Sequence, residues 1–186
     1  MKQTKRITVM AMLLALGLVL PYAFHGIPKG GMLFSPLHMP ALIGGLVLGP
    51  VEGAIVGVLC PILNSMITGM PQGNTLIAMC FELPVYAIVT GIMMRVLKEK
   101  KDGVKIYASL MIAMVLGRVA GGMIQSMILG LGNYSLQMWA TAYFVSTFPG
   151  IVMHLLVIPP VCMALKKAGI ALLCFFKKFE YFLRNA

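Results

Sequence analysis

Two charged side chains lie inside apolar segments of this sequence and could bind a small molecule. Glu82 lies in CFELPVYAI (residues 80–88), and Arg118 lies in MVLGRVAGG (residues 114–122). A carboxylate accepts hydrogen bonds from hydroxyl and amine groups, and a guanidinium donates two parallel hydrogen bonds to a carboxylate. Because an isolated charge is costly in an apolar medium, each of these two residues needs a partner or a water-filled cavity.

Other polar side chains occur at helical spacing around these two charges. Two sets each share one helix face: Asn74, Ala78, Glu82 and Tyr86, spaced by four residues, and Arg118 and Gln125, spaced by seven. We predict that these faces line a substrate pocket, to which Gln72 and His38 in the adjoining segments also contribute. The alternative is a purely structural salt bridge between Glu82 and Arg118 that holds two helices together, and the spacing is compatible with both interpretations.

The composition around these residues is that of a membrane protein. The chain has 186 residues, of which 60% are hydrophobic and 11% are charged, and its mean hydropathy is +0.94. A water-soluble domain of this length must expose much of its surface to water, whereas a lipid bilayer accepts apolar side chains directly. We therefore predict an integral protein of the cell membrane, of bacterial type.

The net charge of +10 does not indicate nucleic-acid binding, because of where the basic residues lie. Most of them form three clusters that flank apolar segments: Lys2, Lys5 and Arg6; Arg95, Lys98, Lys100, Lys101 and Lys105; and Lys166, Lys167, Lys177, Lys178 and Arg184. Basic loops stay in the cytoplasm during insertion, so these clusters mark the cytoplasmic side. The cysteines form no CxxC or Cys/His pattern, and we expect neither a metal nor another cofactor.

The apolar segments predict an all-α bundle of six transmembrane helices, which forms a single membrane domain over residues 1–186. The spans are expected at about 7–24, 32–49, 54–68, 75–94, 106–130 and 141–165, followed by an interfacial tail at 170–186. Six spans place both termini and every basic cluster in the cytoplasm. The second span is short, so it either begins near Met32, despite Pro36 and Pro40, or forms a re-entrant half-helix.

This topology brings the two buried charges to nearly the same depth. Counting 1.5 Å per residue from the expected helix starts puts Glu82 about 10 Å and Arg118 about 12 Å below the outer surface. The polar faces therefore lie in the outer half of the membrane, and the inner half has almost no polar stripe. This asymmetry favours a pocket that opens to the outside. Trp139 and Tyr143, at the outer end of the last span, are expected to be interface anchors.

Small residues recur at four-residue spacing in several spans. The pairs are Ala11 and Ala15, Gly45 and Gly49, Gly53 and Gly57, and Gly117 and Gly121. Such positions let helix backbones approach closely in lipid. For the glycines we expect packing within the bundle. For the alanines, packing within the bundle and docking on another membrane protein are equally compatible with the sequence.

The chain resembles the substrate-binding S components of energy-coupling factor (ECF) vitamin transporters over nearly its whole length. The resemblance rests on the six short spans, the AMLLA element (residues 11–15), and the segments SPLHMPALIGGLVLGPVEGAIVGVLCPILNSMITGMPQGN and FELPVYAIVTGIMMR. It implies that Ala11 and Ala15 dock on a membrane-embedded T component, which two cytoplasmic ATPases drive. It also implies a vitamin site near the outer face, under the connections 25–36 and 69–74.

Together these observations predict the substrate-binding subunit of an ATP-driven importer, and not an enzyme. The sequence has no phosphate-binding loop and no HExxH or GxSxG motif. A pocket arginine favours a carboxylate-bearing vitamin, and the likeness to pantothenate-type members makes pantothenate the leading candidate. If Glu82 neutralises Arg118, a neutral or zwitterionic ligand such as a pyridoxine-like or pyrimidine compound fits equally well. The alternative function is a self-sufficient secondary carrier or channel for a small polar solute, which would need a polar path across both halves of the membrane.

Overall fold

The computed structural model describes residues 3–24, 26–28, 30–130 and 135–168, and the expected interfacial tail lies outside these ranges. The described residues form helices and connections, without any strand. The main helices are α1 (Gln3–Ala23), α3 (His38–Val47), α4 (Pro50–Thr68), α5 (Gly73–Val96), α6 (Asp102–Leu129) and α8 (Phe148–Lys167). The short elements are α2 (Gly30–Phe34), α7 (Leu136–Ala140) and the π-helical turn η1 (Thr141–Val145).

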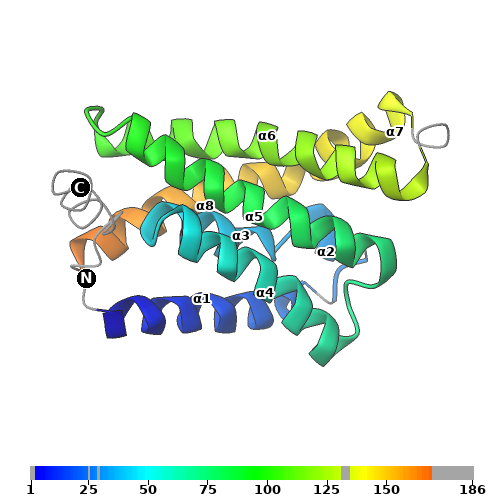
Figure 1. The fold of residues 1–186 in the computed structure, drawn as a ribbon, viewed down its shortest axis with the longest axis horizontal. Coiled ribbons are helices and arrows are strands. Elements are labelled where there is room, and N and C mark those ends of the chain that lie inside the picture. The colour runs from blue at the N-terminus through cyan, green and yellow to red at the C-terminus, as the bar shows by residue number, and fades with distance from the viewer. Residues whose placement is uncertain (1–2, 25, 29, 131–134, 169–186) are drawn as a thin grey trace, which may run out of the picture.

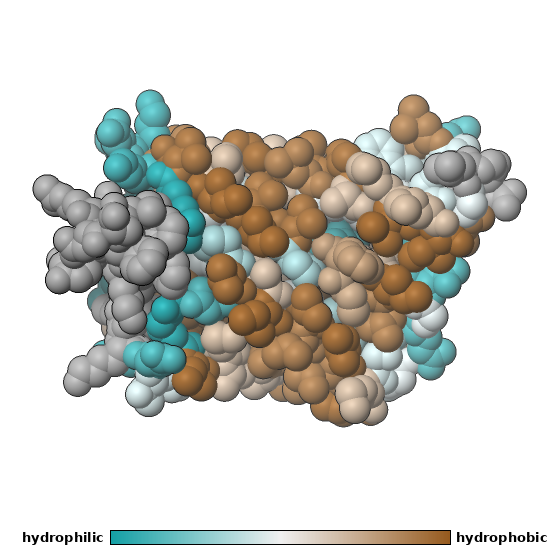
Figure 2. All heavy atoms as spheres, in the orientation of Figure 1, coloured by the Kyte–Doolittle hydropathy of each residue, from teal (hydrophilic) through white to brown (hydrophobic). Residues whose placement is uncertain are grey.

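The long helices run along one common axis (Figure 1). Figure 2 shows a hydrophobic band between two more hydrophilic ends. Among the described residues, six helical segments are long and apolar enough to cross a bilayer, and α2 and α3 together make one of them. α1 begins and α8 ends at the same end of the bundle (Figure 1), where Lys5, Arg6, Lys166 and Lys167 lie. By the positive-inside rule this basic end faces the cytoplasm, and the opposite end faces outward.

Ion pairs connect the helix ends at the cytoplasmic side. Arg6 of α1 pairs with Glu52 of α4, and Lys166 of α8 pairs with Asp102 of α6. Lys105 also lies 3.3 Å from Asp102, one helical turn away. These two acidic residues therefore have Lys or Arg partners at the cytoplasmic end of the bundle.

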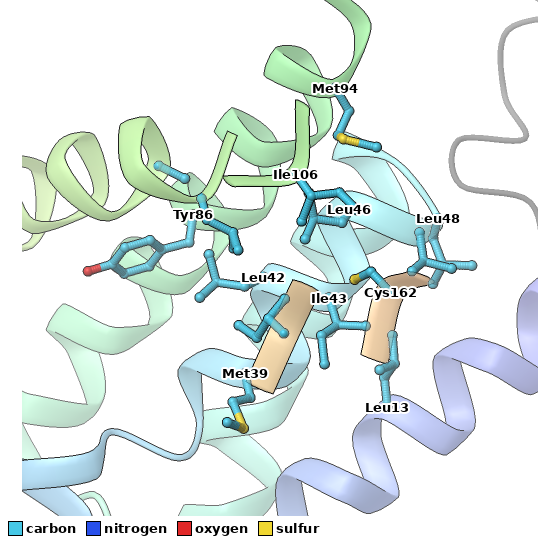
Figure 3. Close-up of a cluster of buried hydrophobic side chains, with 14 of the residues drawn as sticks. Leu13, Met39, Leu42, Ile43, Leu46, Leu48, Tyr86, Met94, Ile106 and Cys162 are labelled. Carbon is cyan, nitrogen blue, oxygen red and sulfur yellow. The ribbon is translucent and has the colours of Figure 1, made fainter. Parts of the chain in front are cut away.

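Helix α3 forms the centre of the bundle, and all its residues are buried. It packs against α1, α4, α5 and α8. Figure 3 shows Met39, Leu42, Ile43 and Leu46 of this helix among side chains from the surrounding helices, including Ile106 and Cys162. A helix that is enclosed by other helices does not have to match the thickness of the bilayer by itself, so α3 can have only 10 residues.

This second span is a broken helix. α2 ends at Phe34 and α3 begins at His38, after a turn in which Ser35 has a left-handed φ of 45°. The end of α2 lies directly on α8, because a Cβ added to Gly150 would come within 2.8 Å of the Leu33 carbonyl oxygen. Non-helical backbone at this depth is tolerated where it is surrounded by protein or lines a cavity. The second span thus begins near Met32, as in the first of the two expected forms, and it is interrupted at residues 35–37.

Two other helix starts differ from the expected ones. α4 begins at Pro50 instead of near Ala54, because proline fits the first helical position and Gly49, with φ 109°, makes the preceding turn. α8 begins at Phe148 instead of near Thr141, because residues 141–145 form the π-helical turn. A π-helical turn has nearly the same apolar pattern as an α-helix, so hydropathy does not distinguish them.

Glycines bring α3, α4 and α5 into backbone contact. A Cβ on Gly53 would lie 2.6 Å from the backbone nitrogen of Gly45, and one on Gly57 would lie 2.9 Å from the backbone carbon of Leu83. The expected packing role of these glycines within the bundle is thus confirmed. Gly117 of α6 instead makes room for a side chain of α5, as described below.

Gly53→Ala is therefore expected to destabilise the protein by about 1–3 kcal/mol, because the added methyl group meets backbone that cannot move aside. Thermal unfolding of the purified protein in detergent measures this effect. Gly103→Ala is the matched control, since nothing lies within 4 Å of its added Cβ. Equal midpoint temperatures of thermal unfolding for Gly53→Ala and Gly103→Ala would contradict the close approach of α3 and α4.

Candidate substrate site

A cavity of about 680 Å³ lies at the outer end of the bundle. Its walls come from the ends of α1 and α4, the connection between α1 and α3, the start of α5, the outer half of α6 and the segment before α8. Such a volume is typical of sites for small molecules. The expected connections contribute, through Ile27, Met32 and Pro36 on one side and Met70 and Pro71 on the other.

The cavity contains most of the predicted site residues. It is lined by His38, Glu82, Tyr86, Arg118 and Gln125. Asn74 and Gln72 do not line it, and both are exposed at the start of α5. A helix turns about 100° per residue, so a strict four-residue series drifts, and Asn74 lies about 120° around the helix from Tyr86. Thr75, only about 20° from Tyr86 by the same count, lines the cavity in its place.

Glu82 is buried in the wall of the cavity, with 4% of its surface exposed. The Tyr86 hydroxyl donates a hydrogen bond to Oε1 at 3.0 Å, and Nε2 of His38 lies 3.4 Å from the same oxygen. Both contacts use Oε1. The other oxygen, Oε2, lies beside Gly121 of α6, where an added Cβ would come within 2.7 Å of it.

Tyr86 connects this polar group to the core. Its ring packs with the buried apolar side chains, and its hydroxyl points away from them (Figure 3). A Cβ added to Gly117 would lie 2.5 Å from the ring, so the absence of a side chain there lets α6 approach α5. Gly117 and Gly121 of α6 therefore accommodate the side chains of Tyr86 and Glu82 of α5.

Arg118 is equally buried, also with 4% of its surface exposed. Its Nε donates to the carbonyl oxygen of Tyr143 at 2.7 Å, and Nη1 donates to the carbonyl oxygen of Met114 at 3.1 Å. Nη2 lies 3.5 Å from Oγ1 of Thr147. These acceptors leave some of the N–H groups of the guanidinium free to bind a ligand.

The structural salt bridge between Glu82 and Arg118 is not formed. In the described part of the chain, the ion pair that involves Glu82 is the one with His38. The hydrogen bonds of Arg118 go to backbone carbonyls and to a threonine hydroxyl. Both charged groups line the same cavity without neutralising each other by direct contact.

Several cavity residues were missed by the sequence analysis, among them Asn64, Tyr143 and Thr147. Asn64 could have been recognised in the sequence as a candidate cavity residue, because an asparagine inside an apolar span is unusual. Its Nδ2 donates at 2.8 Å to the Gly17 carbonyl, which has no helical partner because Pro21 lacks an N–H group. Tyr143 and Thr147 gave no such signal, since their position follows from the π-helical turn.

Comparison with known proteins identifies the family of this chain. A model of one protein family, described as the substrate-specific component of the ECF transporter, matches residues 5–176. The chain belongs to this family. No curated protein and no solved structure gives a significant match.

As an ECF S component, this chain is a multi-pass protein of the cell membrane and the substrate-binding subunit of a transporter. S components are transport subunits and not enzymes, and membership implies association with the T and ATPase components of an ECF transporter. Ala11 and Ala15 of this S component are both exposed on α1, next to the exposed Met12 and Leu16. These alanines are thus on the surface of the bundle and accessible to another membrane protein.

Proposed function

We propose that this S component captures a carboxylate-bearing vitamin at the outer face of the membrane, with pantothenate as the leading candidate. Uptake is then driven by a T component and two ATPases, and the T component docks on Ala11 and Ala15. The observation that carries the substrate assignment is the buried Arg118 in the cavity wall, which has no ion pair with Glu82. A buried guanidinium with free N–H groups favours a ligand that supplies a carboxylate.

Glu82 adds a second requirement on the ligand. Its Oε1 already accepts the Tyr86 hydroxyl, and its carboxylate still has acceptor capacity toward the cavity. A ligand hydroxyl, amide N–H or ammonium group would use this capacity. Pantothenate carries two hydroxyl groups and an amide besides its carboxylate, so it can satisfy Arg118 and Glu82 together. A zwitterionic ligand is the second candidate, because its ammonium group would balance the charge of Glu82.

The other predicted residues that line the cavity have supporting roles in this proposal. His38 and Tyr86 hold the carboxylate of Glu82, and Gln125 lies further out along the Arg118 face of α6. The polar lining of the cavity ends at Tyr86, and apart from Arg118, Ser109 and His154 the buried side chains of α6 and α8 are apolar or glycine. This arrangement favours a binding site that is open only to the outside, so that transport needs partner proteins. A self-sufficient channel or carrier would need a polar path through the inner half as well.

Native mass spectrometry of the purified protein tests the proposal. A bound small molecule that has the mass of pantothenate, and that is released on activation, is the expected result. Arg118→Ala should lose this adduct, whereas Gly103→Ala, at the opposite end of α6, should retain it. Co-purification of a ligand without any acidic group would contradict the role of Arg118.

A further inference from the structure

The segment that precedes α8 forms part of the cavity wall although it is poorly buried itself. We refer to residues 136–147, which comprise α7, η1 and the two residues after them, as the outer strap. None of the described residues in α7 and η1 is buried. Ala142, Tyr143 and Thr147 nevertheless line the cavity. The outer strap is at most partly buried, so its specific contacts with α6 contribute to holding it in place.

Arg118 provides the first set of these contacts. Its Nε and Nη2 contact the Tyr143 carbonyl oxygen and Thr147 Oγ1, and the Thr147 hydroxyl donates to the same carbonyl at 2.6 Å. In addition, the guanidinium carbon lies 5.8 Å from the ring centroid of Phe144. The outer strap thus fixes the plane of the guanidinium from one side.

Trp139 provides the second contact, on the backbone of the same residue. Its indole Nε1 donates to the carbonyl oxygen of Arg118 at 3.1 Å. The indole lies directly on Gly122, where an added Cβ would come within 2.1 Å of the ring. Trp139 also packs edge-to-face against Phe144, with 5.3 Å between the ring centroids. The residue expected to be an outer-interface anchor is therefore turned toward α6.

We propose that Trp139 is a positioning residue of the substrate site. The indole of Trp139 packs on Gly122 and holds the outer strap against α6. The outer strap in turn holds the guanidinium of Arg118 in the orientation that binds the acidic group of the ligand. Neither Trp139 nor Gly122 lines the cavity, so both act through Arg118. This inference rests on the proposed function of Arg118. Its physical basis is preorganisation, because a guanidinium that is already oriented loses less entropy when the ligand binds.

Gly122→Ala tests this role, because the added methyl group displaces the indole without changing any residue of the cavity wall. Binding is measured with pantothenate and with pantothenol, in which an alcohol replaces the carboxylate. We expect pantothenate affinity to fall about tenfold and pantothenol affinity to change little, because one well-placed charge-assisted hydrogen bond is affected. Trp139→Phe keeps an aromatic ring but loses the N–H group. It should also lower the affinity for pantothenate more than that for pantothenol, but by a smaller factor than Gly122→Ala. Gly103→Ala is the control and should behave as the wild type. An equal loss for both ligands would reduce Trp139 to a structural role and overturn the proposal.

Hydrogen exchange without any ligand provides an independent readout. In Gly122→Ala, the amides of residues 136–147 should exchange about fivefold to tenfold faster, whereas those of α5 and of the inner half of α8 should not change. If the amides of residues 136–147 exchange at an unchanged rate in a folded Gly122→Ala variant, the contact of Trp139 with Gly122 does not hold the outer strap, and the proposal is refuted. If the wild type binds neither pantothenate nor pantothenol, the assignment of pantothenate fails, and hydrogen exchange alone decides whether Trp139 holds the outer strap.

Discussion

Replacing Arg118 by alanine is expected to weaken the binding of a carboxylate vitamin by about 1.5–3 kcal/mol, which is roughly tenfold to 150-fold in affinity. The reason is that Arg118 is the buried cation in the cavity wall and is not paired with Glu82. Without it, the carboxylate of the ligand would be desolvated next to Glu82 with no compensating charge. Equilibrium binding of radiolabelled pantothenate to the protein in lipid nanodiscs measures this loss.

Arg118→Lys separates the contribution of charge from that of geometry. Lysine retains the positive charge but cannot form bidentate hydrogen bonds to a carboxylate. It also cannot reproduce the contacts of Arg118 with Tyr143 and Thr147. An intermediate affinity is therefore expected. A folded Arg118→Ala protein that binds pantothenate with unchanged affinity would assign Arg118 to holding the outer strap alone.

Changing Ala11 and Ala15 together to leucine is expected to abolish uptake and to leave ligand binding by the isolated protein intact. Both alanines are exposed on one face of α1, and the cavity begins further along this helix at Pro21. Two larger side chains at these positions prevent the close approach of a partner helix in the membrane. Uptake by cells that express the whole transporter, compared with binding by the purified subunit, tests this separation.

A matched control for the alanine pair is available on α6. Val115 and Val119 have the same four-residue spacing and are 48% and 39% exposed. Changing both to leucine enlarges an exposed apolar face that has no assigned partner, so uptake should persist. Parallel loss of binding and uptake in the alanine variant would show that the substitutions damage the subunit itself, and would refute the docking role.

The class of the protein could be predicted from the sequence because it depends on local composition. Runs of apolar residues with basic flanks predict helices that cross a bilayer in a defined direction, and the six segments of the structure agree with this prediction. The charges at positions 82 and 118 were also identifiable, because an ionisable residue inside an apolar run requires a functional or structural partner. His38, Glu82, Tyr86, Arg118 and Gln125 do meet at one cavity.

The sequence did not predict where helices break or which way some side chains face. The break at residues 35–37 and the π-helical turn at 141–145 leave hydropathy nearly unchanged, so neither the break inside the second span nor the later start of α8 could be predicted. Asn74 does not line the cavity, because four-residue spacing approximates one helix face over one turn but not over three. Trp139 was assigned to the outer interface because aromatic residues at span ends usually lie there, whereas the space above Gly122 allows it to turn inward.

Hydropathy and charge along the chain were thus enough to predict a six-helix membrane protein with two charges in its outer half. That these charges do not pair with each other follows from the packing of the helices, in which Arg118 contacts Tyr143 and Thr147 while Glu82 contacts Tyr86 and His38. Hydropathy and periodicity cannot predict these contacts, because they report the environment of each residue along its own helix. Which side chains meet across helices depends on where glycines allow close approach and where the helices break.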